Sequence, residues 1–358
     1  MKNGIIIDQT RPDQTRPDQH IARNSALELL RVAGMLVIVA HHFAVHGGFD
    51  FPANTITLNR LWQQFIFMGG SLGNDIFVML SGYFLVKSPG LNYRRLFNLW
   101  FRMFFYSVVI YCLFTVSGLE VFSLKQALKI LMPVTKSQWW FASTYFVMYL
   151  VHPYMNRLLH SLSREDYLKF LKAIFFYWCI IPVLTNSDFG ANATINFMCL
   201  YCLAGYLRLH AEDYGSRKYI LYGLAFVGVN FLSVIALDIA GTRHPYFAKM
   251  SSYFLGMMRP FTVLAVLCLV IGFRSLNIPS SKIINVIASA TFGVYLIHDN
   301  RYVRPFLWVN VFRNASFQES SHLIPYSIAV IMIVYISCTV IELLRQKAFR
   351  TLSGGRLS

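Results

Sequence analysis

Long apolar stretches alternate with short polar, mostly basic segments along this chain. The first stretch, residues 27–45, is long enough to cross a hydrocarbon core of about 30 Å at about 1.5 Å of rise per residue. Further stretches lie near residues 61–86, 99–117, 139–158, 170–185, 193–208, 219–239, 253–273, 284–298 and 323–344. The pattern predicts an all-α polytopic membrane protein with about ten transmembrane helices.

Composition supports a membrane protein and sets its expected orientation. Hydrophobic residues make up 56% of the 358 positions and charged residues only 13%. The formal charge of +16 could suggest a nucleic-acid partner, but the basic residues lie in short loops between apolar stretches, so we expect none. Most of the 32 Lys and Arg residues fall on the side that holds both termini. The positive-inside rule therefore predicts that both termini are cytoplasmic.

The two ends of the chain differ from its apolar middle. Residues 1–24 are polar and contain DQTRP twice, at 8–12 and 13–17, which favours a disordered cytoplasmic segment. Residues 25–345 form the expected transmembrane domain. Residues 346–358 are basic, and we expect a cytoplasmic tail that lies against membrane lipid. No cleavable signal peptide is expected.

All the cysteines lie in apolar stretches, which argues against a disulfide framework. Cys199 and Cys202 form a CxxC pair, but no second ligand pair accompanies it. We expect no metal site. The cysteines are Cys112, Cys179, Cys199, Cys202, Cys268 and Cys338.

Ionisable residues within the first apolar stretch are the first candidates for chemistry. Arg31 and His42 are eleven positions apart, which places them within about 20° of one helix face and about 16 Å apart along the axis. Glu28 lies one turn before Arg31, whereas His41 points elsewhere. Arg31 could simply snorkel or pair with Glu28, and His42 could be an interfacial histidine. Alternatively, one helix face carries a cation at one end and an imidazole at the other for a functional reason.

A basic cluster follows the second stretch. It is either a topology determinant that touches lipid phosphates or a site that captures a phosphorylated cytosolic ligand together with Arg31. Such a ligand could extend a flexible arm along the helix face from Arg31 to His42. The cluster consists of Lys87, Arg94, Arg95 and Arg102.

The second stretch also carries an acid, Asp75, at a depth where a carboxylate needs a partner. It could orient His42 through a ring N–H, or it could pair with a structural arginine such as Arg259. Ser81 and Gly82 are more typical of close helix packing than of chemistry.

Polar and aromatic residues gather around the ninth stretch and its exit, in TFGVYLIHDNRYVRPFLW. His298, Asp299, Arg301 and Arg304 are expected at the outer interface. Rings and charges of this kind suit both an aromatic belt and a carbohydrate site. The second interpretation makes His298, Asp299 and Arg301 candidate substrate-binding residues.

Together these residues resemble membrane acyltransferase family 3, whose members O-acylate bacterial polysaccharides and other acceptors. The resemblance covers roughly residues 25–345. Its opening motif is an acid, followed one turn later by Arg or Lys, and then after ten further residues by His. Glu28, Arg31 and His42 match this motif. The second-stretch motif matches GNDIFVMLSGYFL with Asp75, and the ninth-stretch TFGVYLIHDN is similar as well.

The chain departs from one motif of the family. Many members carry an RxxR pair after the second stretch, but here Arg95 is followed by Asn98. Arg94 or Arg102 would then compensate.

The resemblance implies transfer of an acyl group, most often acetyl, from cytosolic acyl-CoA to a sugar hydroxyl of a surface polysaccharide or its lipid-linked precursor. The location implied is the bacterial cytoplasmic (inner) membrane. Arg31, Arg94 and Arg95 would bind the CoA phosphates, and His42 with Asp75 would supply catalysis. His42 would act as general base, or less simply as a nucleophile.

Two other functions remain open at this stage. A transporter of a small solute or a lipid-linked sugar would also have many spans and intramembrane charges, although no inverted repeat is evident. A scaffold or receptor without chemistry would need Arg31 only for folding.

Overall fold

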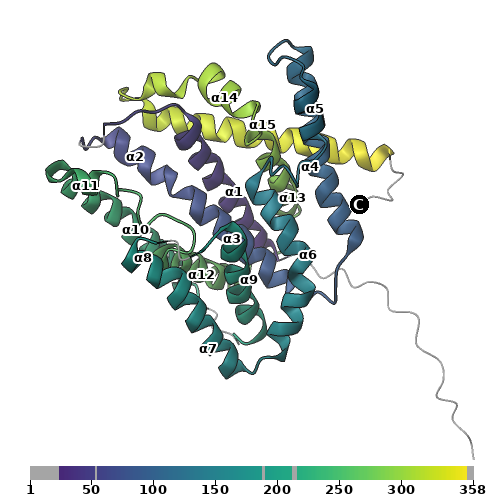
Figure 1. The fold of residues 1–358 in the computed structure, drawn as a ribbon, viewed down its shortest axis with the longest axis vertical. Helices are drawn as coiled ribbons and strands as arrows, with labels where there is room; N and C mark the ends of the chain where they lie inside the picture. Colours follow the sequence, from purple (N-terminus) through teal and green to yellow (C-terminus); the bar gives the residue numbers. More distant parts are fainter. Residues whose placement is uncertain (1–23, 53–54, 188–189, 212–215, 353–358) are drawn as a thin grey trace, which may run out of the picture.

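The computed structural model describes residues 24–52, 55–187, 190–211 and 216–352, which form helices and no strand. Almost all of the predicted disordered segment 1–24, and the last residues of the predicted tail, lie outside these ranges. Figure 1 shows the helices gathered into one bundle.

The predicted stretches correspond to helical segments in chain order. The helices of the first half are α1 (Ser25–His46), α2 (Leu58–Phe67), α3 (Gly69–Leu85), α4 (Tyr93–Val116), α5 (Leu124–Ile130), α6 (Trp140–Ser161), α7 (Arg164–Phe175), the π-helix η1 (Phe176–Ile180) and α8 (Ile181–Thr185). Those of the second half are α9 (Ala193–Leu209), α10 (Lys218–Arg243), α11 (Pro245–Ala248), α12 (Pro260–Arg274), α13 (Lys282–His298), α14 (Val303–Pro305), the π-helix η2 (Phe306–Val311), the 3₁₀ turn η3 (Asn314–Phe317) and α15 (Leu323–Leu352).

Several of these segments have the length and hydropathy needed to cross a bilayer. Within the described residues, 6 helical segments qualify: Ser25–His46, Leu58–Leu85, Tyr93–Val116, Arg164–Thr185, Lys218–Arg243 and Leu323–Leu352. Shorter apolar helices are Ala193–Leu209, Pro260–Arg274 and Lys282–His298. The all-helical class and the membrane-spanning character are therefore confirmed, while ten crossings and cytoplasmic termini remain predictions.

One predicted stretch begins too early. The stretch expected at 253–273 becomes helical only at Pro260, because proline fits the first turn of a helix but not its interior. Residues 346–352 of the expected tail are helical, because α15 continues without a break to Leu352, and the cytoplasmic tail against lipid stays a prediction. Pro153, in contrast, lies inside α6 without ending it.

Helix α1 lies at the centre of the bundle and contacts α2, α3, α12, α13 and α15 (Figure 1). Its first turn is capped by the Asn24 side chain, which accepts hydrogen bonds from the N–H groups of Ala26 and Leu27. Glycine allows α3 to approach closely, since a Cβ at Gly73 would lie 2.6 Å from the carbonyl oxygen of Gly34. The packing holds the Arg31–His42 face of α1 within the protein.

Close packing also accounts for Gly82. A Cβ at Gly82 would lie 3.1 Å from the Cα of Tyr201 on α9, so the glycine lets α3 and α9 meet. This contact agrees with the packing interpretation of Gly82, whereas Ser81 lines a cavity described below.

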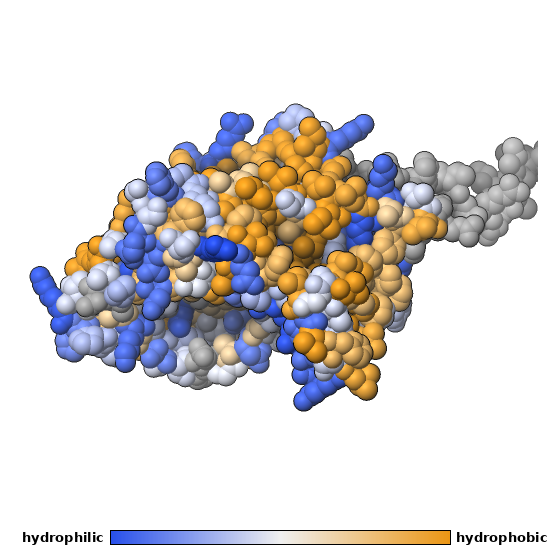
Figure 2. All heavy atoms as spheres, turned by 90° about the horizontal axis from the view of Figure 1, so that it is seen from above, coloured by the Kyte–Doolittle hydropathy of each residue, from blue (hydrophilic) through white to orange (hydrophobic). Residues whose placement is uncertain are grey.

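The outer surface is rich in apolar side chains. Leu113, Leu221, Leu232 and Ile283 are each more than half exposed, as are many others. Figure 2 shows broad apolar areas beside a hydrophilic region. Such a surface suits contact with lipid rather than water.

Candidate functional site

His42 lies at the end of α1 that is opposite to Arg31, in contact with the C-terminal end of α13. Its Nδ1 lies 2.8 Å from Nε2 of His298. His298 is fully buried, and its Nδ1 lies 2.6 Å from the carbonyl oxygen of Val294. Two helices far apart in sequence therefore build a chain of ring nitrogens that ends on a backbone carbonyl.

The positions of the hydrogens on the two histidine rings follow from the carbonyl oxygen of Val294. A carbonyl oxygen only accepts, so Nδ1 of His298 carries the hydrogen and donates to Val294. Nε2 of a neutral His298 then accepts, and His42 Nδ1–H donates to it. The remaining nitrogen of a neutral His42, Nε2, is left without a hydrogen. It is the nitrogen that can take up a proton.

Asp299, which directly follows α13, faces this nitrogen. Its Oδ1 lies 3.5 Å from Nε2 of His42, 3.7 Å from Nε2 of His46 and 2.7 Å from Nε of Arg304. Burial alone would raise the pKa of Asp299, but the neighbouring His42 and His46 rings and the Arg304 guanidinium together lower it below its usual value. The carboxylate is therefore ionised and placed to stabilise a proton on His42.

A cavity opens beside the opposite end of α1. It has a volume of about 460 Å³, within the usual range for ligand sites, and is called the Arg31 cavity below. It is lined by Glu28, Arg31, Phe77, Ser81, Leu85, Arg95, Asn98, Leu99, Arg102, Phe141, Tyr145, Tyr149, Ala288, Ser289, Thr291 and Phe292. Three arginines thus meet one acid at the cavity wall.

Arg31 is held in place at this wall by an ion pair. Its Nη1 donates to both carboxylate oxygens of Glu28, at 2.8 and 2.7 Å. The pairing with Glu28 that the sequence allowed is therefore present. It does not remove Arg31 from the cavity, because the side chain still lines it and is about a quarter exposed (24%).

Aromatic rings connect the Arg31 cavity with the partner of His42. Phe141 lines the cavity, and its ring centroid lies 5.8 Å from that of Tyr295. The Tyr295 ring lies 6.4 Å from that of His298. Side chains of α6 and α13 are therefore in contact from the cavity wall to the histidine pair.

Comparison of the whole sequence with models of protein families identifies the kind of protein that carries this buried histidine and cationic cavity. A family model described as an acyltransferase domain, that of acyltransferase family 3, matches residues 24–343. The chain belongs to this family. No curated protein and no solved structure gave a significant match. The resemblance seen in the sequence is confirmed, and with its apolar helices this acyltransferase is a multi-pass membrane protein.

Asp75 of the acyltransferase is not near His42 in the way the sequence suggested. It is fully buried on α3, and neither carboxylate oxygen has a hydrogen-bond partner among the described residues. Its surroundings include the backbone of Met258 and the Cys179 thiol. Asp299 instead occupies the position beside His42, so the hypothesis that Asp75 orients the imidazole is corrected.

The alternative partner of Asp75 is not engaged either. Arg259 stacks over the Tyr253 ring at 5.0 Å, and its buried Nη1 has no hydrogen-bond partner among the described residues. No ion pair within 4.0 Å joins it to Asp75.

The structure places the predicted substrate-binding residues in different environments, some buried and one exposed. His298 and Asp299 are fully buried and contact His42, so they do not form an open sugar site. Arg301 is exposed, donates to Gln126 at 3.3 Å and lies over the Tyr302 ring. Among these residues, only Arg301 has the exposure that direct contact with an acceptor needs.

The predicted CoA-binding arginines are divided as well. Arg31 and Arg95 line the Arg31 cavity, together with Arg102. Arg94 is exposed and is not among the residues that line it. Of the two arginines expected to compensate for Asn98 in the RxxR motif, Arg102 lines the cavity and Arg94 does not.

Sequence reasoning missed His46 and gave no role to Arg304. His46 follows His42 by one turn, so the i to i+4 spacing on α1 was a usable signal. The salt bridge from Arg304 to Asp299 crosses the end of α13, where no helical period relates the two residues. No signal in the sequence assigned this pairing.

Proposed function

We propose that this acyltransferase moves an acyl group, most simply acetyl, from cytosolic acyl-CoA to a hydroxyl of a surface polysaccharide or its lipid-linked sugar precursor. The observation that carries the proposal is the presence on one helix of His42, whose Nδ1 lies 2.8 Å from Nε2 of His298, and of Arg31, about 16 Å away along the helix axis in the wall of a cationic cavity. The location proposed is the bacterial inner membrane, with the Arg31 end of α1 on the cytosolic side.

The chemistry follows from the proton positions. His42 Nε2 takes the proton of the acceptor hydroxyl as its oxygen attacks the thioester carbonyl. The carbon–sulfur bond then breaks, and the CoA thiolate takes the proton back from the imidazolium. Asp299 stabilises the imidazolium while it exists, and His298 holds the ring orientation through His42 Nδ1.

The donor is proposed to enter through the Arg31 cavity. Phosphate groups suit the guanidinium forks of Arg95 and Arg102, and the pantetheine arm would then point along α1. The contact between the rings of Phe141 and Tyr295 leads from this cavity toward His298, so the thioester is proposed to pass beside these rings to reach His42.

A direct test measures donor and acceptor together. Mass spectrometry of surface polysaccharide from cells with and without the protein should show a mass difference of one acyl group, and the purified chain should release CoA thiol from acetyl-CoA. Transport of a solute without thioester turnover would contradict the proposal and favour a transporter.

Replacing Arg31 by alanine should raise the KM for acetyl-CoA about tenfold or more, because a charged hydrogen bond to the donor is lost before the chemical step. The measurement is a steady-state titration with acetyl-CoA. Arg94→Ala is the matched control, since Arg94 does not line the cavity, and its KM should not change. Loss of kcat with an unchanged KM would place Arg31 in packing instead.

Chelators should leave turnover unchanged. One ligand atom from each of His42, His46 and Asp299 lies within 4.8 Å of the others, close enough to hold a metal ion. However, Arg304 already places a positive charge 2.7 Å from the same Asp299 oxygen, and this charge disfavours a cation beside it. Activity lost in EDTA and restored by Zn²⁺ would contradict the prediction that no metal is used.

A further inference from the structure

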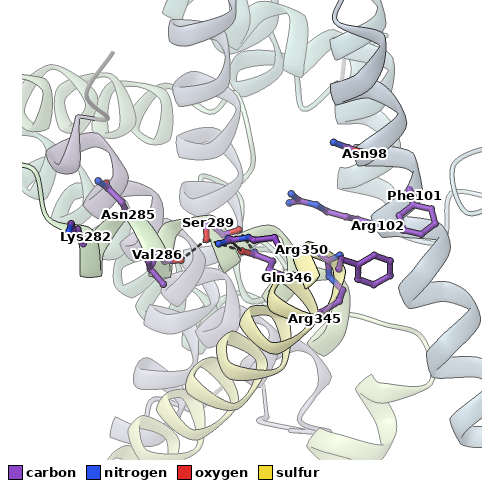
Figure 3. A pocket seen from close by; sticks show the side chains of 11 residues that line it. Asn98, Phe101, Arg102, Lys282, Asn285, Val286, Ser289, Arg345, Gln346 and Arg350 are labelled. Carbon is purple, nitrogen blue, oxygen red and sulfur yellow. Dashed lines mark hydrogen bonds between the residues drawn. The ribbon is translucent and has the colours of Figure 1, made fainter. Parts of the chain in front are cut away.

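A second cavity lies beside the Arg31 cavity, between α4, α13 and α15. It has a volume of about 550 Å³ and is called the Lys282 cavity here. Its lining residues are Asn98, Phe101, Arg102, Lys282, Asn285, Val286, Ser289, Arg345, Gln346, Phe349 and Arg350. Figure 3 shows side chains from the three helices surrounding one space, with Arg102 reaching toward α15 from α4. Of these residues, the mechanism above uses only Arg102, and only Asn98 stands at a position of a family motif.

The lining is strongly basic. It contains Arg102, Lys282, Arg345 and Arg350, and no Asp or Glu among the described residues lines it. Behind the wall, buried Glu342 accepts two hydrogen bonds of 2.7 Å from Arg345. One carboxylate thus fixes one of the arginines, and the wall as a whole keeps a positive excess.

Lys282 is placed unfavourably unless an anion is near it. It is the first residue of α13, and no acidic residue occupies the first turn of that helix. A cation at this position meets the positive end of the helix dipole, where an anion would be favoured. Lys282 forms no ion pair with any described residue.

Neutral groups complete the lining in a way that suits a base as well as phosphate. The rings of Phe101 and Phe349 lie 5.6 Å apart at 77°, which leaves an aromatic wall. Asn98 and Asn285 add amides that can donate and accept, whereas the Gln346 amide already donates to Ser289 and Glu342. A nucleotide with several phosphates matches this combination better than a lipid headgroup, because its heteroaromatic base can stack on the phenylalanine rings and a headgroup offers no such base.

The two cavities adjoin each other. Asn98, Arg102 and Ser289 line both of them. A ligand that occupies the Lys282 cavity can therefore continue past Arg102 into the Arg31 cavity.

We propose that the Lys282 cavity binds the 3′-phosphorylated adenosine diphosphate end of the acyl-CoA donor, while the pantetheine arm occupies the Arg31 cavity. Lys282 and Arg350 hold the 3′-phosphate, and Arg102 holds the diphosphate at the junction. This assignment rests on the proposed function, because it takes acyl-CoA to be the donor.

The test compares CoA with 3′-dephospho-CoA, which lacks only the 3′-phosphate. Binding of each is measured by calorimetry to the purified full chain in nanodiscs of zwitterionic lipid. Wild-type protein should bind CoA at least about tenfold more tightly, and Lys282→Ala should reduce this preference to about twofold or less. The matched control is Lys218→Ala, an exposed lysine that, like Lys282, is the first residue of its helix but does not line the Lys282 cavity, and this variant should keep the preference.

The outcomes separate this inference from the proposed function. If wild-type protein binds CoA but shows no preference over 3′-dephospho-CoA, or if Lys282→Ala keeps the preference, this assignment is wrong while the donor stays CoA. If wild-type protein binds neither compound, the proposed donor itself is wrong. A further measurement tests whether the cavity is a lipid headgroup site instead, by comparing the anionic lipid bound to wild-type protein and to Lys282→Ala. If the variant binds less anionic lipid but keeps the preference for CoA, the assignment is overturned.

Discussion

Replacing His42 by alanine is expected to lower kcat for acyl transfer by about 10²- to 10⁴-fold, the usual contribution of a general base. The reason is that no other described side chain presents an unprotonated nitrogen next to both His298 and Asp299. The KM for acetyl-CoA should change little, because His42 does not line the Arg31 cavity. The measurement is thiol release coupled to acylation of the acceptor.

His41→Ala provides the matched control for this prediction. His41 is the neighbouring histidine of α1, but its Nδ1 lies 2.6 Å from the carbonyl oxygen of Phe67, away from Asp299. This variant should keep most of the wild-type kcat. A His42→Ala protein that folds and turns over normally would remove the proposed base.

Replacing Asp299 by asparagine should lower kcat by about 10- to 100-fold, because the imidazolium of His42 loses a charged partner worth about 1.5–3 kcal/mol. The same change at Asp75 should have a much smaller effect, since Asp75 makes no hydrogen bond or ion pair to the histidines. Comparing kcat for the two variants decides which acid serves His42.

Folding must be followed in the same experiment, because Asp299→Asn also weakens the pair with Arg304. The thermal unfolding midpoint of each variant in detergent gives this control. The loss of kcat should not add to that of His42→Ala in the double variant, since both residues act through one proton. Fully additive losses, or a larger effect at Asp75, would contradict the assignment of Asp299.

Features within one helix could be predicted from the sequence. Arg31 and His42 share a face of α1 because helix geometry fixes the angle between residues eleven positions apart. The structure places one in a cavity wall and the other against α13. Stretch length and hydropathy likewise identified the helices, because a bilayer demands long apolar segments.

Partners on different helices could not be predicted. Asp75 and Asp299 are both acids in apolar surroundings, and only the packing of α13 against α1 places Asp299 beside His42. The Lys282 cavity has the same origin, because it joins the start of α13 to the end of α15. The sequence pattern assigned the end of α15 to a surface tail, since periodicity does not show which helix ends meet.

The most direct test of the central claim is the sidedness of the reaction. Proteoliposomes are prepared with the purified full chain, surface polysaccharide sealed inside and radiolabelled acetyl-CoA outside. Label should reach the enclosed polysaccharide with wild-type protein and not with His42→Ala, because the donor enters at the Arg31 end and reacts at the His42 end of α1. Label that stays outside while wild-type protein consumes acetyl-CoA, or equal transfer by the variant, would contradict the account.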